Sequence, residues 1–95
     1  MDLHDYLDRV QDQATFLDFV QALVRDRRDE VARERERPSG PYGPGANGWQ
    51  NTTIEDFLEA AVRWAEDSGD REEGLPDQPA WKAFADFLYC GKVYE

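Results

Sequence analysis

The sequence predicts an all-α fold: a small single-domain helical bundle of three main helices plus a short N-terminal helix. Apolar residues recur at helical spacing in four segments, no segment alternates steadily between apolar and polar residues, and stretches that contain proline and glycine separate the last three segments. With 95 residues, 40% of them hydrophobic and 13% aromatic, the chain can build one core from large side chains. We therefore expect one domain over residues 1–95.

The best-specified helix is expected over residues 53–67. Thr52, followed three residues later by Glu55, matches the capping-box pattern that begins a helix. Gly69 is a favourable residue just beyond its end. The apolar residues of this segment form one stripe at helical spacing: Ile54, Phe57, Leu58, Ala61, Trp64 and Ala65.

Three further helices are expected over residues 3–10, 13–37 and 80–90, each from its own apolar stripe. Asp12 is a suitable N-cap for the long second helix, and Thr15 with Asp18 is an alternative start. Pro38 ends that helix, because a proline ring clashes with helical hydrogen bonding.

The second half of the long helix has an unusual composition. Residues 25–37 hold six arginines and five acidic residues, so they carry +1 of the net charge of −10 and leave −11 on the rest of the chain. Mixed charges on good helix formers predict a solvated helical extension. The interleaved acids argue against an RNA-binding arm, because they repel phosphate.

Two connections without regular structure are expected. The first, over residues 38–51, is rich in proline and glycine, and we expect Tyr42 and Trp49 to hold it against the core. It lacks the glycine spacing of a phosphate-binding loop. The second covers residues 68–79 and does not match the ligand pattern of a calcium loop.

The helical stripes together predict the core. We expect it to consist of Phe16, Phe19, Leu23, Phe57, Leu58, Trp64, Trp81, Phe84 and Leu88.

Residues suited to catalysis are sparse. His4 is the single histidine and has no nucleophile nearby in the sequence. Cys90 lies near the C-terminal end of its helix, where a thiolate is not favoured, so we expect it to fill space in the interior. The Glu-x-x-His pairs of helical di-metal sites are absent. We therefore expect a non-enzymatic protein with no catalytic residue, metal or cofactor.

The charge limits the kinds of partner. A net charge of −10 disfavours nucleic acid and anionic membranes, permits a basic protein partner, and is also compatible with a role in solubility alone. The candidate partner-binding residues form an acidic face: Glu55, Asp56, Glu59, Glu66, Asp67, Glu72 and Glu73. A single cysteine, no long apolar run and an acidic N-terminal stretch lead us to expect a cytoplasmic protein, as a monomer or homodimer.

A set of motifs runs through nearly the whole chain. Phe16-x-x-Phe19 precedes Trp49-x-Asn-x-Thr, a Phe-Leu-Glu-Ala helix follows from Phe57, and a Trp81-led helix closes on Tyr94-Glu95. In this order the motifs resemble a family of small acidic bacterial proteins of unknown function. The resemblance implies a bacterial cytoplasmic domain and brings no activity or cofactor with it.

Three functional hypotheses remain open. The leading one is a protein-binding module whose acidic face engages a basic partner, for example as an immunity-type inhibitor. The second is a small-molecule or metal-dependent enzyme with the loop of residues 38–51 over a pocket near Trp49. The third is a structural protein that self-associates through exposed aromatic residues of the last helix.

Overall fold

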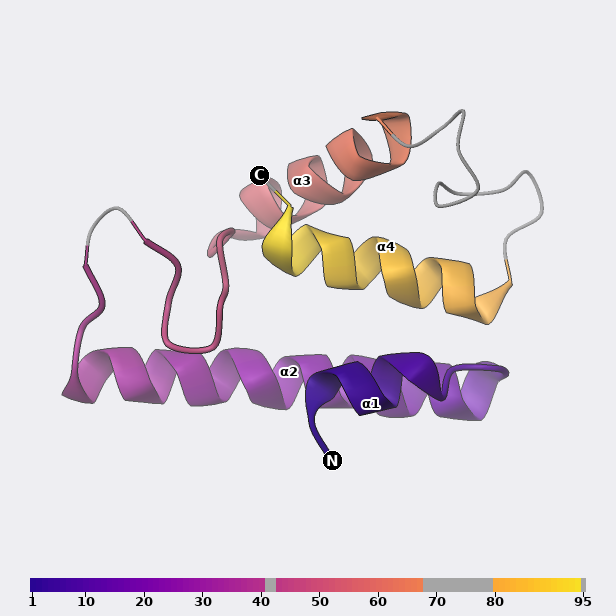
Figure 1. Cartoon of the computed structure of the whole chain (residues 1–95), viewed down its shortest axis with the longest axis horizontal. Coiled ribbons are helices and arrows are strands. Elements are labelled where there is room, and N and C mark those ends of the chain that lie inside the picture. The colour runs from indigo at the N-terminus through magenta and orange to yellow at the C-terminus, as the bar shows by residue number, and fades with distance from the viewer. Residues whose placement is uncertain (41–42, 68–79, 95) are drawn as a thin grey trace.

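The protein is described here from a computed structural model over residues 1–40, 43–67 and 80–94. These residues form four helices and no strand: α1 (Leu3–Asp8), α2 (Gln13–Glu36), α3 (Ile54–Asp67) and α4 (Trp81–Val93) (Figure 1). The predicted all-α fold of three main helices and a short first helix is confirmed.

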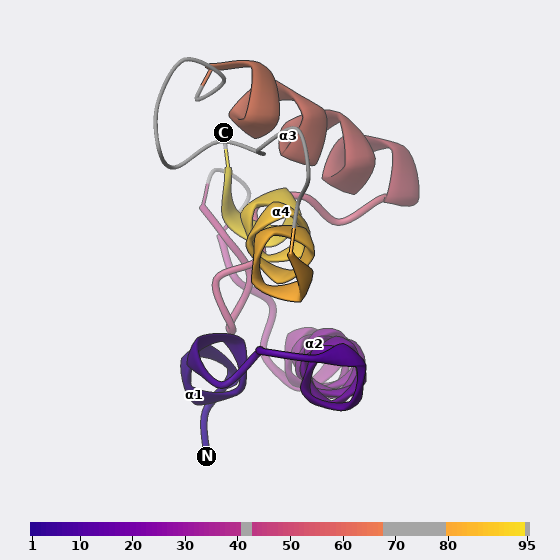
Figure 2. The ribbon, with the colours of Figure 1, turned by 90° about the vertical axis from the view of Figure 1, so that its right-hand side faces the viewer.

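The helices stack in three layers (Figure 2). Helices α1 and α2 pack side by side in the first layer, α4 packs on both of them, and α3 packs on the opposite side of α4. Within these four helices, no Cα atom of α2 lies within 8 Å of a Cα atom of α3. Helix α4 is thus the central element, and α3 is covered by a helix on one side only.

The start of α2 decides between the two predicted caps. The Asp12 side chain accepts a hydrogen bond from the backbone N–H of Thr15 at 2.9 Å, and the Thr15 hydroxyl accepts one from the backbone N–H of Asp12 at 3.1 Å. Asp12 is therefore the N-cap, and Thr15 completes the capping box from inside the helix.

The predicted cap of α3 is wrong by one residue. Thr53, rather than Thr52, caps the helix, since its hydroxyl accepts a hydrogen bond from the backbone N–H of Asp56 at 3.1 Å. The two adjacent threonines are each followed three residues later by an acid, Glu55 or Asp56, so the pattern alone does not distinguish them.

The helix boundaries differ most at α1 and α4. Helix α1 ends at Asp8, two residues before the expected end, and Val10 is buried beyond it. Helix α4 continues through Gly91 to Val93 instead of ending at residue 90. Gly91 fits there because it packs against Phe57 of α3, where an added Cβ would lie 2.9 Å from the ring.

The core prediction is partly correct. Phe19 and Leu23 are buried, and four other predicted residues are partly buried: Phe16, Phe57, Trp64 and Leu88. The prediction is wrong for Leu58, Trp81 and Phe84, because 47%, 39% and 42% of their surfaces remain exposed. Leu58 is exposed because it lies on the side of α3 that none of the four described helices covers.

Small residues and the loop supply the missing part of the core. Leu7, Val10 and Trp49 belong to the buried cluster, and four alanines are buried where helices approach closely: Ala22, Ala60, Ala61 and Ala85. Two of these alanines lie in α3 and one in α4. Close approach through alanine lets these helices pack without the large side chains that the sequence predicts.

The prediction of a solvated second half of α2 is correct for most of its residues, which are exposed, and wrong at Glu30. Glu30, in the middle of that segment, is only 1% exposed, because the loop that follows α2 folds back along the helix (Figure 1). Trp49 holds this loop in the core as predicted, whereas Tyr42 lies outside the described residues.

A helix that spans a membrane must be both long and apolar. Among the residues that the structure describes, no helix meets both requirements.

Candidate functional site

Three acidic residues at one-turn spacing on α2, Asp26, Glu30 and Glu34, hold the following loop. Each accepts hydrogen bonds from loop residues, and we refer to the three as the loop clamp. Residues four apart lie on the same side of a helix, so the spacing places the three carboxylates in one row beneath the loop. The clamp fixes the path of the chain into α3.

Glu30 is the buried centre of the loop clamp. Its Oε1 atom accepts hydrogen bonds from the backbone N–H groups of Asn47 and Trp49, both at 3.1 Å. Its Oε2 atom accepts one from the Arg27 guanidinium at 2.8 Å. The loop backbone comes so close at Gly45 that an added Cβ would lie 2.3 Å from this carboxylate. These partners satisfy a carboxylate that would otherwise be costly to bury.

Asp26 joins the loop to the end of α4. Its Oδ2 atom accepts hydrogen bonds from the Trp49 indole at 2.8 Å and from the Lys92 ammonium at 2.7 Å. The charged groups of Arg27 and Lys92 also lie 5.6 and 5.5 Å from the centre of the Trp49 ring. Trp49 is thus fixed between two cations and one carboxylate.

The outer part of the clamp is more exposed. Glu34 accepts hydrogen bonds from the hydroxyl and backbone N–H of Ser39, both at 2.6 Å, and from the backbone N–H of Ala46 at 2.8 Å. The bonds from Ser39 hold the pKa of Glu34 below its ordinary value. On the neighbouring side of α2, a hydrogen bond from the Asn47 side chain lowers the pKa of Asp29.

Two further loop residues attach to the C-terminal end of α4. The backbone N–H of Gln50 donates to the carbonyl of Lys92 at 3.1 Å. The Asn51 side chain donates to the carbonyls of Gly91 and Tyr94 at 3.0 and 2.9 Å. Loop, α2 and α4 are therefore joined just before α3 begins.

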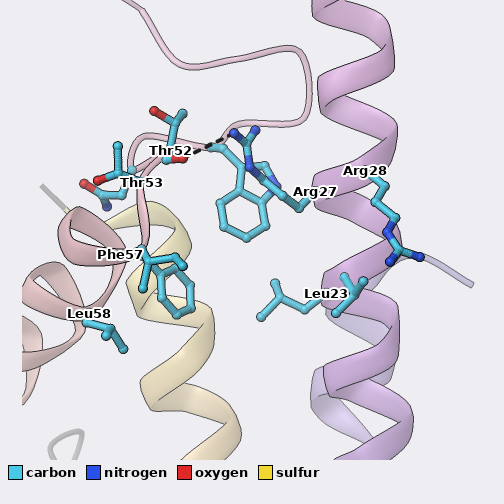
Figure 3. A pocket seen from close by; sticks show the side chains of 11 residues that line it. Leu23, Arg27, Arg28, Thr52, Thr53, Phe57 and Leu58 are labelled. Atoms are coloured by element: carbon cyan, nitrogen blue, oxygen red, sulfur yellow. Dashed lines mark hydrogen bonds between the residues drawn. The ribbon is translucent and has the colours of Figure 1, made fainter.

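A groove of about 510 Å³ lies between α2 and the start of α3 (Figure 3). Leu23 of α2 and Phe57 of α3 point toward each other across it, and Arg27 reaches from α2 to the carbonyl oxygen of Thr52. The lining is mainly apolar on its inner surface and carries two arginines on the α2 side. The groove residues are Leu23, Val24, Arg27, Arg28, Trp49, Asn51, Thr52, Thr53, Ile54, Phe57 and Leu58.

One wall of the groove continues as an apolar stripe along the uncovered side of α3. Ile54, Leu58 and Val62, spaced four residues apart, are 77%, 47% and 46% exposed. A second hollow, of about 310 Å³, is lined by Leu58 and Val62 together with Glu59 and Arg63. We call Ile54, Leu58 and Val62 the α3 stripe.

The predicted acidic residues lie beside the α3 stripe. Glu55, Glu59 and Glu66 are exposed, and the helical repeat of about 100° per residue places them in one row that borders the stripe. We call this row the acidic edge. Asp56 and Asp67 are exposed farther around the helix, and Asp67 accepts a hydrogen bond from the Tyr94 hydroxyl. Glu72 and Glu73 lie outside the described residues.

The apolar spacing predicts that Leu58 of the α3 stripe belongs to the core and does not show that the stripe forms a surface. The signal for such a surface is the width of the apolar arc: Phe57 and Trp64 pack inward, whereas Leu58 and Val62 lie about 100° to 160° away around the helix. One neighbouring helix cannot cover so wide an arc. Arg28, on the opposite wall, was grouped with the solvated arginines.

The remaining chemically interesting side chains do not enter the groove. Burial raises the pKa of Cys90 from 9.0 to about 11, with the charge of Asp86 adding to the effect, so the thiol is held in its protonated form. The His4 ring packs edge-on against Tyr89. Within the described residues, no cluster of three His, Cys, Asp or Glu side chains has the arrangement of a metal site.

Comparison with known proteins gives one match. Residues 12–95 match the DUF7660 family, a family of unknown function. No curated protein and no solved structure matches the chain.

Proposed function

We propose that this chain, which belongs to the DUF7660 family of unknown function, is a non-enzymatic protein-binding module for a basic partner. The partner contacts the α3 stripe and pairs its basic groups with the acidic edge. Apolar contact supplies the affinity, and the charges accelerate and select the encounter.

The exposed α3 stripe is the observation that carries this proposal. Ile54, Leu58 and Val62 lie in a row on the surface, and the groove extends this apolar surface onto α2. Contiguous apolar surfaces rimmed by polar residues mark sites of interaction. Scattered exposed apolar residues would not carry the same meaning.

The charge distribution supports a basic partner. The acidic edge borders the stripe along α3, and the chain as a whole has a net charge of −10. An acidic surface attracts a basic protein over distances of about 10 Å at moderate salt. An immunity-type inhibitor of a basic toxin is one concrete form of such a module. The free, half-buried Cys90 supports a cytoplasmic place of action.

The lining of the groove favours binding over catalysis. Among the residues that the structure describes, no aspartate or glutamate lines the groove. The carboxylates of Glu30 and Glu34 line a separate hollow of about 390 Å³, where both already accept hydrogen bonds from the loop. A working acid–base pair requires a carboxyl group that can reach substrate.

Affinity capture with matched variants tests the proposal. The immobilised protein is exposed to lysate of the source organism at low and moderate salt, beside the double variant Glu59→Lys/Glu66→Lys. Asp8→Lys/Asp18→Lys serves as the control, because it reverses two exposed acids away from α3 and changes the net charge equally, from −10 to −6.

We expect a basic protein that is retained by the wild type and by the control but lost with the α3 variant and with salt. Leu58→Glu should release the same protein at every salt concentration, because it places a charge in the apolar contact. Equal retention by the wild type and both charge variants would refute the role of the acidic edge.

A further inference from the structure

The packing of the helices leaves the space between α2 and α3 without a helix among the described residues. Helices α2 and α3 pack on opposite sides of α4 and not on each other (Figure 2). Helix α1 lies on α2 and α4, with no Cα atom within 8 Å of α3. The groove therefore lies beside α4, between two helices that do not contact each other.

The groove and the α3 stripe together suit a helix. The α3 wall of the groove ends at Leu58, and the stripe continues from there to Val62 in the second hollow. From Ile54 to Val62 the stripe extends for about 12 Å, at 1.5 Å per residue, or slightly more than two helical turns. Val24 on α2 is 44% exposed and faces the same groove. A helix seated there buries its apolar side against both walls, which is how amphipathic helices bind hydrophobic grooves.

The two walls of the groove differ in charge. The α3 wall is bordered by the acidic edge, whereas the α2 wall carries Arg27 and Arg28. Arg27 is already paired with Glu30, but Arg28 is exposed and has no ion-pair partner among the residues that the structure describes. An occupant that satisfies both walls has basic residues along one edge and an acidic residue on the other.

The net charge favours a helix from another protein over a second copy of this chain. Two copies would bring together two molecules of charge −10, and the helix with the uncovered stripe has an acidic edge of its own. Like charges that face each other across an interface disfavour the association. The negative electrostatic field of the protein attracts a basic partner and repels a second copy of this chain.

We infer that the partner occupies the groove with an amphipathic helix, with lysine or arginine facing the acidic edge and an acidic residue facing Arg28. This inference rests on the proposed function and specifies the part of the partner that is recognised. The α3 stripe and Val24 bind its apolar face. The two charged walls fix its orientation, because reversing the helix would place like charges opposite each other.

Three designed peptides test the inference. Each is a helix of about 18 residues, or five turns, with the same leucine face, long enough to form in isolation. One has lysine on both edges, one has glutamate on both edges, and one has lysine on one edge and glutamate on the other. Fluorescence anisotropy of labelled peptide gives the affinities.

We expect the mixed peptide to bind most tightly, the lysine peptide next, and the glutamate peptide at least about tenfold more weakly than the mixed one. In the Arg28→Glu protein the lysine peptide should overtake the mixed peptide, because both walls are then acidic. Leu58→Glu and Val62→Asp should each weaken the mixed peptide about tenfold or more, and thermal melts confirm that these surface variants fold. Asp18→Lys, on the exposed surface of α2, is the control and should keep the wild-type order.

The inference is overturned if no peptide binds, or if the order of the peptides is the same in the Arg28→Glu protein. A dimer in sedimentation equilibrium that Leu58→Glu converts to monomers would also overturn it. In that case a second copy of this chain, and not a partner helix, covers the groove. If a basic protein is captured and its binding requires Glu59 and Glu66 but not Leu58, the proposed function holds and the helix in the groove is wrong. If binding of the captured protein changes with no substitution on α3, both the proposed function and the inference are wrong.

Discussion

Replacement of Glu30 tests the role of the loop clamp most directly. In Glu30→Ala the backbone N–H groups of Asn47 and Trp49 lose the acceptor that they share at 3.1 Å. A hydrogen bond to a charged acceptor contributes about 1.5–3 kcal/mol, so two such bonds contribute about 3–6 kcal/mol. The Arg27 pair adds little, because 32% of the Arg27 side chain is exposed and water screens it.

The matched variant Glu30→Gln removes the negative charge of the side chain but keeps a hydrogen-bond acceptor, so it distinguishes the two contributions. The amide oxygen of glutamine can take the place of Oε1 and keep both backbone hydrogen bonds, whereas its NH₂ group faces the Arg27 guanidinium. We expect a loss of about 1–2 kcal/mol, for one unfavourable donor–donor contact. The expected order of stability is wild type, then Glu30→Gln, then Glu30→Ala.

Thermal and urea unfolding, followed by circular dichroism, measure these differences. A loss of 3 kcal/mol or more lowers the melting temperature of a domain of this size by at least about 12 °C. Glu36→Ala, at an exposed position of the same helix, is the control and should change stability by less than about 0.5 kcal/mol. The reasoning is refuted if Glu30→Ala costs under about 1 kcal/mol, or if alanine and glutamine are equally destabilising.

Three further predictions concern other parts of the fold. Gly91→Ala should lower stability by roughly 1 kcal/mol in urea unfolding although alanine favours helices, because its Cβ would lie 3.0 Å from the carbonyl oxygen of Phe57; a gain in stability would contradict this contact. Glu34 has a folded-state pKa below 4.5, so its contribution should be complete above that pH and be lost as the pH falls through the lowered value. Urea midpoints of wild type and Glu34→Gln should therefore converge under acid, and a constant difference would count against the bonds from Ser39. Cys90, with its pKa near 11, should react with iodoacetamide at pH 9 at least about tenfold more slowly than free cysteine, and unfolding in urea should restore the rate.

Much of the fold follows from local rules that the sequence displays. The apolar spacing and caps predict four helices, and Pro38 predicts the end of α2 to within about two residues. Helical spacing alone does not say how many neighbours a helix has. The spacing therefore predicts Leu58 in the core, although among the described helices α3 packs on α4 alone.

The loop clamp was beyond prediction for a different reason. Glu30 and Glu34 look like ordinary members of a charged helix, and their partners are mostly backbone N–H groups about 5 to 19 residues away. Backbone donors carry no sequence signature, so the pairing of a helical carboxylate with a glycine-rich loop appears only in three dimensions. The acidic residues of α3 were identified correctly as exposed, because helical periodicity alone fixes which side they occupy.

The clamp also has a consequence for protein engineering. Asp26, Glu30 and Glu34 follow one another by single turns, and without the loop their charges would repel along the helix. A variant in which residues 38–48 are replaced by a short glycine–serine linker would look like a harmless loop truncation. It would instead destabilise the end of α2, because the carboxylates of Glu30 and Glu34 would lose backbone donors that the loop supplies.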